Sequence, residues 1–123
     1  MLLYLSASKL AVSVALIQEA MVEGNLRQLP VYFVSEALSG AKLSYSEYEK
    51  FAYALVMTTR KLKHYFEAHS IAVVIDKPIA NLFANKQAPP RIAKWATEVS
   101  TFNITFVRRN AIKSQVLADF ISD

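Results

Sequence analysis

The spacing of the apolar residues changes period along the chain, and this pattern constrains the fold more than any other feature of the sequence. Residues 2–8 and 10–18 are rich in apolar and β-branched side chains. A turn at Glu23-Gly24-Asn25 separates them from a third such run, residues 30–35. Runs of this kind with short links predict three consecutive antiparallel strands.

The spacing becomes helical from Tyr45 onward. Apolar residues recur at three- and four-residue intervals and form one stripe, which consists of Tyr48, Phe51, Ala52, Leu55, Val56, Thr59, Leu62 and Phe66. Ser46 and Glu49 have the spacing of a capping box, in which each side chain bonds the backbone N–H of the other residue. We therefore predict a long helix that begins at Ser46.

The second half of the chain alternates between the two patterns. Strand-like runs lie at 71–75 and 103–107, and helical spacing lies at 79–83, 92–102 and 114–121. The predicted order is βββ-α-β-α-α-β-α, which is a mixed sheet with helices packed on it, an α/β (mixed α+β) fold. A length of 123 residues fits a single domain that spans the whole chain, residues 1–123.

Composition excludes several classes of protein. With 54% hydrophobic and 20% charged residues, the chain has enough apolar material for a packed core. It has no cysteine, which excludes disulfide-stapled folds and thiolate metal sites. No apolar run approaches the ~20 residues of a membrane helix, so we expect an intracellular protein, cytoplasmic or nuclear, with no membrane partner. The net charge of +4 favours a polyanionic partner only slightly.

Seven short strings carry a family resemblance. They are Tyr4-Leu5-Ser6-Ala7-Ser8, 30–38, Tyr45-Ser46-Glu47-Tyr48-Glu49-Lys50, 60–66, Ile75-Asp76-Lys77-Pro78-Ile79, 91–95 and 117–121. In order and spacing they resemble the ribonuclease H-like domain of a plant gypsy-type LTR-retrotransposon reverse transcriptase. The resemblance implies a ribonuclease H-like fold, with a five-stranded mixed sheet and helices on both faces.

Active members of that family cut the RNA strand of RNA–DNA hybrids with two divalent ions, Mg²⁺ or Mn²⁺. The ions require carboxylate oxygens, and the family supplies them from four acidic positions. Carried onto this sequence, the four positions are Ser6, Glu49, Asp76 and Asp119. The resemblance thus makes Glu49, Asp76 and Asp119 the candidate catalytic residues and metal ligands.

Ser6 stands where the family has its first aspartate, the residue that bridges both ions. A serine hydroxyl is neutral and a poor ligand for Mg²⁺. Many family members also carry a histidine before the last helix, and residues 107–111 contain none. We therefore predict little or no nuclease activity. Each remaining acid also has a structural interpretation: Glu49 as a helix cap, Asp76 as a turn residue and Asp119 as a solvated helix residue.

Basic residues gather in three clusters that suggest contact with nucleic acid. The candidate binding residues are Arg60, Lys61, Lys63, Arg91, Lys94, Arg108 and Arg109. In active relatives, basic side chains beside the sheet hold the hybrid backbone, so a phosphate-binding surface is one interpretation. The other is a set of solvated helix ends, where cations favour the negative end of the helix dipole.

Three functions follow from this pattern. The first is a degenerate ribonuclease H domain that connects a polymerase domain to a later nuclease domain and binds hybrid weakly. The second is a working ribonuclease that tolerates Ser6, since the remaining carboxylates can bind one ion, with Mn²⁺ more forgiving than Mg²⁺. The third is a domesticated module that binds another cellular protein.

Overall fold

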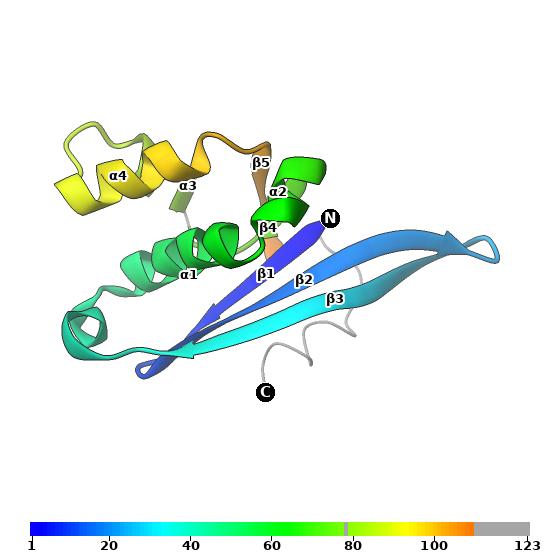
Figure 1. The fold of residues 1–123 in the computed structure, drawn as a ribbon, viewed down its shortest axis with the longest axis horizontal. Coiled ribbons are helices and arrows are strands. Elements are labelled where there is room, and N and C mark those ends of the chain that lie inside the picture. The colour runs from blue at the N-terminus through cyan, green and yellow to red at the C-terminus, as the bar shows by residue number, and fades with distance from the viewer. Residues whose placement is uncertain (78, 110–123) are drawn as a thin grey trace.

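The computed structural model describes residues 1–77 and 79–109, which form one five-stranded sheet with helices packed against it (Figure 1). The strands are β1 (Leu2–Ala7), β2 (Ala11–Val22), β3 (Asn25–Ala37), β4 (Ile71–Val74) and β5 (Ile104–Val107). Their order in the sheet is β3-β2-β1-β4-β5. β1, β2 and β3 pair antiparallel, whereas β4 pairs parallel with both β1 and β5. The prediction of a mixed five-stranded sheet is confirmed.

Five helical segments connect the strands in the part of the chain that the structure describes. They are the 3₁₀ helix η1 (Gly40–Ser44) and the α-helices α1 (Glu47–Lys61), α2 (Lys63–Ala68), α3 (Ile79–Ala84) and α4 (Pro90–Val99). The long helix predicted from Ser46 is therefore interrupted at Leu62, whose φ of −118° and ψ of 35° are not helical. Across the part of the chain that the structure describes, no helix has both the length and the apolar character needed to cross a membrane.

The main core lies between one face of the sheet and the helices. Alternate residues of the first strands, such as Leu3 and Leu16, point into it, and α1 contributes Leu55 and Val56. The other face carries a smaller apolar cluster, which consists of Leu2, Tyr4, Ala15, Ile17 and Val74. The described helices contribute to the first cluster and not to the second. The helix predicted at 114–121 lies outside the described residues.

The β2–β3 hairpin extends well beyond the rest of the sheet (Figure 1). β1 pairs with β2 only as far as Ile17, so residues 18–29 form a two-stranded ribbon. Its turn has positive φ at Glu23 (52°) and Gly24 (79°), as a tight hairpin turn requires. β3 is longer than the predicted run at 30–35 because pairing with β2 continues to the turn.

Candidate functional site

The register between β1 and β4 sets the position of the candidate site. In this parallel pair, Tyr4 lies opposite Val74. Continuing the register by two residues places Ser6 level with Asp76, each at or just past the carboxyl end of its strand. The structure therefore brings the first and third of the four family positions to one edge of the sheet.

Asp76 is exposed beside a small cavity, and a backbone N–H holds its carboxylate. Its Oδ1 accepts a hydrogen bond from the amide of Arg109 at 3.2 Å. Two hollows are lined in part by Asp76, with volumes of about 160 Å³ and about 90 Å³. The smaller hollow is lined by Leu5, Phe51, Val74, Ile75, Asp76, Lys77 and Arg109. Apolar and cationic side chains thus surround this carboxylate.

Glu49 lies at the interface between α1 and α4. Its Oε1 accepts the Ser46 N–H at 3.1 Å, and its own N–H bonds the Ser46 hydroxyl at 3.2 Å. Its Oε2 accepts a charge-assisted hydrogen bond from Arg91. Burial raises the pKa of Glu49, but the hydrogen bonds from Ser46 and Arg91 outweigh it and hold the pKa below its usual value. The capping-box interpretation is confirmed, and both carboxylate oxygens have partners away from Asp76.

Phe51 is the α1 residue that lines the hollow beside Asp76. It follows Glu49 by two positions, which on an α-helix turns the side chain by about 200° around the axis. The two side chains therefore point to opposite sides of α1. Phe51 belongs to the apolar stripe predicted from the sequence, and this stripe indicates that Phe51 faces the sheet.

The described residues around Asp76 do not fit a pair of divalent ions. No group of three or more acidic or histidine side chains that could hold a metal occurs within residues 1–77 and 79–109. Mg²⁺ needs several carboxylate oxygens, whereas Asp76 shares its surroundings with Phe51, Lys77 and Arg109. Asp119, the fourth acidic position, lies outside the described residues.

Four of the seven predicted nucleic-acid-binding residues form ion pairs within the domain. Arg60 pairs with Glu98 at 2.6 Å, Lys61 with Glu36 at 3.8 Å, Lys63 with Glu67 at 3.5 Å, and Arg91 with Glu49. Within the described residues, Lys94, Arg108 and Arg109 have no ion pair. The predicted basic surface therefore divides into side chains that form ion pairs inside the domain and side chains that form none within the described residues.

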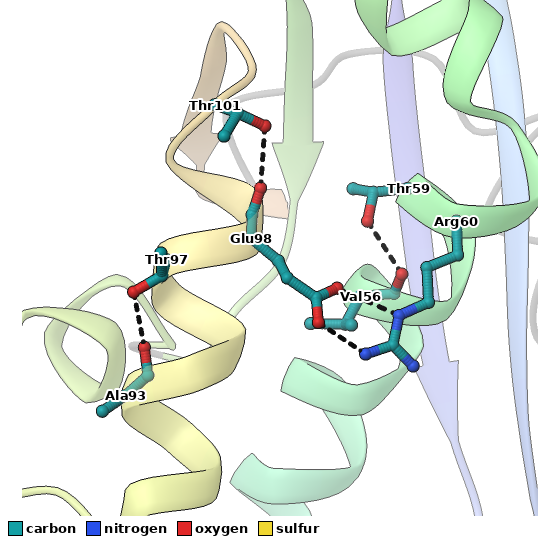
Figure 2. A network of polar contacts seen from close by, with 7 residues as sticks. All are labelled: Val56, Thr59, Arg60, Ala93, Thr97, Glu98 and Thr101. Carbon is teal, nitrogen blue, oxygen red and sulfur yellow. Dashed lines mark hydrogen bonds and ion pairs between the residues drawn. The ribbon is translucent and has the colours of Figure 1, made fainter.

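The pair between Arg60 and Glu98 shows the first kind of role (Figure 2). The Arg60 Nε and Nη2 atoms donate to the two carboxylate oxygens of Glu98, at 3.0 and 2.6 Å, and so join α1 to α4. The hydrogen bond from Arg60 lowers the pKa of Glu98. The carboxylate of Glu98 offsets the positive charge of the Arg60 guanidinium, which weakens the attraction of that guanidinium for a phosphate.

The strand order, the parallel β1–β4 pair and the helix packed across them define a ribonuclease H-like α/β domain. Comparison with known families agrees: residues 1–102 match the RNase H-like domain found in reverse transcriptase. The chain belongs to this family. A search of curated proteins found no significant match.

Two solved structures of a foamy viral protease-reverse transcriptase share the fold. One, in complex with an RNA/DNA hybrid, has a TM-score of 0.66 and 15% identity; the match covers 92% of this chain and 15% of that one. The other, described as dRH and in complex with ds DNA, has a TM-score of 0.65 and 13% identity, over 92% of this chain and 20% of that one. This chain therefore spans a fifth or less of the length of those proteins.

Proposed function

We propose that the chain is a catalytically degenerate ribonuclease H-like domain of a plant gypsy-type retrotransposon reverse transcriptase. It spans residues 1–123 and serves as a structural connection or a weak nucleic-acid-binding module. The observation that carries this proposal is the lining of the hollow beside Asp76, where α1 contributes Phe51 rather than a carboxylate. Of the sequence-based candidates Glu49, Asp76 and Asp119, Asp76 is the described residue that lies level with Ser6.

Two-ion hydrolysis depends on carboxylates that bridge and flank the ions, because these neutralise the charge of two divalent cations at short range. At the edge of the sheet in this chain, Ser6 and Phe51 contribute no charge, and Lys77 adds a positive one. Asp76 is the only acidic residue that the structure describes in the linings of these hollows, and one carboxylate supplies too few oxygens for either ion. This arrangement supports a domain that keeps the ribonuclease H-like fold but has lost hydrolysis of RNA–DNA hybrids.

A cleavage assay tests the proposal. A labelled RNA–DNA hybrid is incubated with the wild type in Mg²⁺ and in Mn²⁺, and we expect no cleavage above the rate without protein. We expect Ser6→Asp and Phe51→Glu each to remain inactive and the double variant to gain weak cleavage that Asp76→Asn removes. A matched control pairs Ser6→Asp with Tyr48→Glu, which adds the same charge to α1 at an exposed residue that does not line the hollow beside Asp76.

Cleavage by the wild type that Asp76→Asn abolishes would refute degeneracy and establish the second function, an active ribonuclease. Equal gains in the Phe51→Glu and Tyr48→Glu double variants would show that Phe51 does not occupy the position of the missing carboxylate. The assay of the wild type therefore tests the loss of activity, and the comparison of the double variants tests whether Phe51 explains that loss.

A protein-contact role is the second candidate, and the β2–β3 ribbon favours it. Met21 and Leu26 pair across the ribbon and are 67% and 62% exposed, and Val22 and Leu29 are exposed on the opposite face. Apolar side chains gathered on a projecting ribbon are typical of a surface that contacts another protein. This surface suits both a structural connection within a larger protein and a domesticated interaction module. A pull-down from plant extract with an Asn25→Lys, Leu26→Ser variant as control distinguishes specific partners from adhesion.

A further inference from the structure

Strand β5 lies at an open edge of the sheet. Among the described residues it pairs with β4 on one side and with no strand on the other. Proteins protect such edges with lysine, proline or a bulge, but β5 contains neither residue and pairs with β4 in continuous register. The opposite edge strand, β3, contains Pro30 and a shift in its register with β2. β5 is therefore the less protected edge of the sheet.

Alternate residues of β5 turn their backbone groups toward the open edge. The carbonyls of Asn103 and Val107 accept hydrogen bonds on the β4 side, at 3.0 and 2.9 Å. Backbone groups of a strand point to alternate sides, so Thr105 also faces β4, whereas Ile104 and Phe106 face away from it. These two residues therefore offer N–H donors and C=O acceptors to an incoming strand.

The side chains of Ile104 and Phe106 line an apolar groove of about 540 Å³ between β5, α3 and α4. The rest of the lining includes three larger apolar residues, Phe83, Val99 and Phe102, and small residues of the two helices, such as Ala80, Ala84 and Ala96. A strand that pairs with β5 places every second side chain on this face of the sheet. Because β5 is only four residues long, backbone pairing alone holds such a strand weakly, and the groove adds apolar contact.

The groove adjoins a positively charged hollow at the carboxyl end of β5. This hollow, of about 160 Å³, shares Ala80 and Phe106 with the groove, and its charged lining residues are Asp76, Lys77 and Arg108. Arg108 is exposed and has no ion pair within the described residues. Since it follows Phe106 by two positions, its guanidinium favours a carboxylate two residues before the first apolar side chain of an antiparallel strand.

We propose that β5 and this groove bind an extended segment of a partner protein, which adds to the sheet as an antiparallel strand. The segment carries a carboxylate opposite Arg108 and apolar side chains opposite Phe106 and Ile104. Antiparallel pairing is slightly more stable per residue than parallel pairing, which decides the direction. The proposal goes beyond the proposed function, since it concerns the edge of the sheet opposite the β2–β3 ribbon and holds whether or not the domain cleaves RNA.

A labelled heptapeptide with blocked ends, Thr-Glu-Thr-Ile-Thr-Ile-Thr, tests the proposal by fluorescence anisotropy with the full chain. The matched peptide Thr-Glu-Thr-Thr-Ile-Ile-Thr has the same composition, but its apolar side chains point to opposite faces of a strand. We expect the alternating peptide to bind at least about fivefold more tightly, because both of its isoleucines enter the groove. N-methylation of either isoleucine, whose N–H faces β5, should raise Kd about three- to tenfold. N-methylation of the threonine between them should change Kd less than about twofold, because that N–H points away from β5.

Amide hydrogen exchange distinguishes strand addition from contact between side chains alone. With saturating peptide, the amides of Ile104 and Phe106 should exchange about tenfold more slowly, because each gains a hydrogen bond to the peptide. The amides of Thr105 and Val107 face β4 and are internal controls, so their exchange should change little.

Two pairs of protein variants test the position of the site. Ala84→Leu narrows the groove and should raise Kd at least about fivefold, whereas Ala68→Leu adds the same side chain at an exposed residue of α2 outside the groove. Arg108→Gln should raise Kd about threefold for the alternating peptide and less than about twofold for the same peptide with glutamine in place of glutamate. Lys94→Gln removes a positive charge from α4 outside both linings and should affect the two peptides equally. Circular dichroism and urea unfolding verify that each variant retains the fold.

Several results would overturn the proposal. They are no binding of the alternating peptide, equal binding of the two peptides of matched composition, equal weakening by Ala84→Leu and Ala68→Leu, or no selective protection of the Ile104 and Phe106 amides. Protection of these amides that rises with protein concentration in the absence of peptide would assign the edge to a second copy of the chain and would also refute a partner segment. Equal effects of Arg108→Gln on the glutamate and glutamine peptides would refute the contact with a carboxylate.

Discussion

The guanidinium of Arg91 pairs with the carboxylate of Glu49 and so joins the first turn of α4 to the first turn of α1. The same guanidinium lies 4.4 Å from the ring centroid of Tyr45 and 5.7 Å from that of Trp95. Glu49 therefore accepts a capping hydrogen bond at the N-terminus of α1 and also pairs with a cation on α4. These contacts give its carboxylate a structural role, and they hold it away from Asp76.

Removing the charge of Glu49 should destabilise the fold. We expect Glu49→Gln to lower the free energy of unfolding by about 1 kcal/mol, since the capping box and the ion pair are both weakened. A double-mutant cycle with Arg91→Gln should give a coupling energy of about 0.5 kcal/mol, because Arg91 is partly exposed and solvent screens the pair. Urea unfolding at neutral pH measures both. Zero coupling would show that the two side chains do not interact in solution.

The stability contributed by Glu49 should depend on pH in a defined direction. Its folded-state pKa lies below its usual value, because the hydrogen bonds from Ser46 and Arg91 outweigh the opposing effect of burial. The contribution is therefore present above the unfolded pKa of about 4.3 and is lost as pH falls through the folded pKa. Wild type and Glu49→Gln should converge in stability at acid pH. A constant difference down to low pH would contradict this assignment.

Tyr53 forms the centre of a second polar network. Its hydroxyl donates to Glu36 and accepts from Lys42 Nζ at 2.8 Å, which joins β3, α1 and η1. The side chain is 7% exposed. We expect Tyr53→Phe to cost about 1 kcal/mol of unfolding free energy, because Glu36 loses its donor. Tyr48→Phe, at an exposed position on the same helix, is the control and should change little.

The ionisation of Tyr53 provides an independent measurement. Burial, together with the hydrogen bond to Glu36, raises the pKa of Tyr53 above its usual value. The stabilisation is present below the unfolded pKa of about 10 and is lost as pH rises through the folded pKa. Spectrophotometric titrations of the wild type and of Tyr53→Phe should differ by one tyrosine that ionises above the ordinary pKa of about 10. A normal titration of this residue would exclude the network.

The sequence predicted the order of the strands and helices along the chain, but neither the arrangement of the strands in the sheet nor every element length. Short apolar runs were sufficient to predict β1, β4 and β5, because strands buried in the sheet are rich in such residues. The ribbon at 18–29 was missed because most of its side chains, among them Gln18, Glu19 and Arg27, are not buried by a core, so no apolar period marks them. Backbone pairing with the other arm of the hairpin extends these strands instead.

The candidate site was harder to predict than the fold. The string at 45–50 placed Glu49 near the start of a helix, but such a short string does not specify which side of the helix each residue occupies. The apolar stripe does contain it, and it places Phe51 toward the sheet. The partners of Arg60 and Arg91, residues 38 and 42 positions away along the chain, depend on how α1 and α4 pack. No local pattern specifies that packing.

Lys50 stabilises the turn between β1 and β2. The residue is 9% exposed, and its ammonium donates to the carbonyls of Ser8 and Lys9, each at 3.2 Å. Lys50→Met retains the aliphatic stem and removes the donors, so we expect a loss of about 1–2 kcal/mol in unfolding free energy. Amide hydrogen exchange should accelerate at Ala11, whose N–H bonds Ser8 Oγ in that turn. Lys9→Met, at an exposed side chain, should change neither quantity.

The ribbon should govern how the isolated protein associates with itself. Met21 and Leu26 are directly paired across β2 and β3, and both are mostly exposed. Burying them against another molecule removes apolar surface from water, whereas in the isolated fold they contact little. We expect Met21→Ser with Leu26→Ser to shift unfolding by less than about 0.5 kcal/mol. The same variant should lower the apparent mass at high concentration in light scattering and weaken binding of an apolar dye.

Leu10→Ser is the control, because Leu10 is equally exposed but lies in the β1–β2 turn. An equal effect of Leu10→Ser would assign the association to general hydrophobicity rather than to the ribbon.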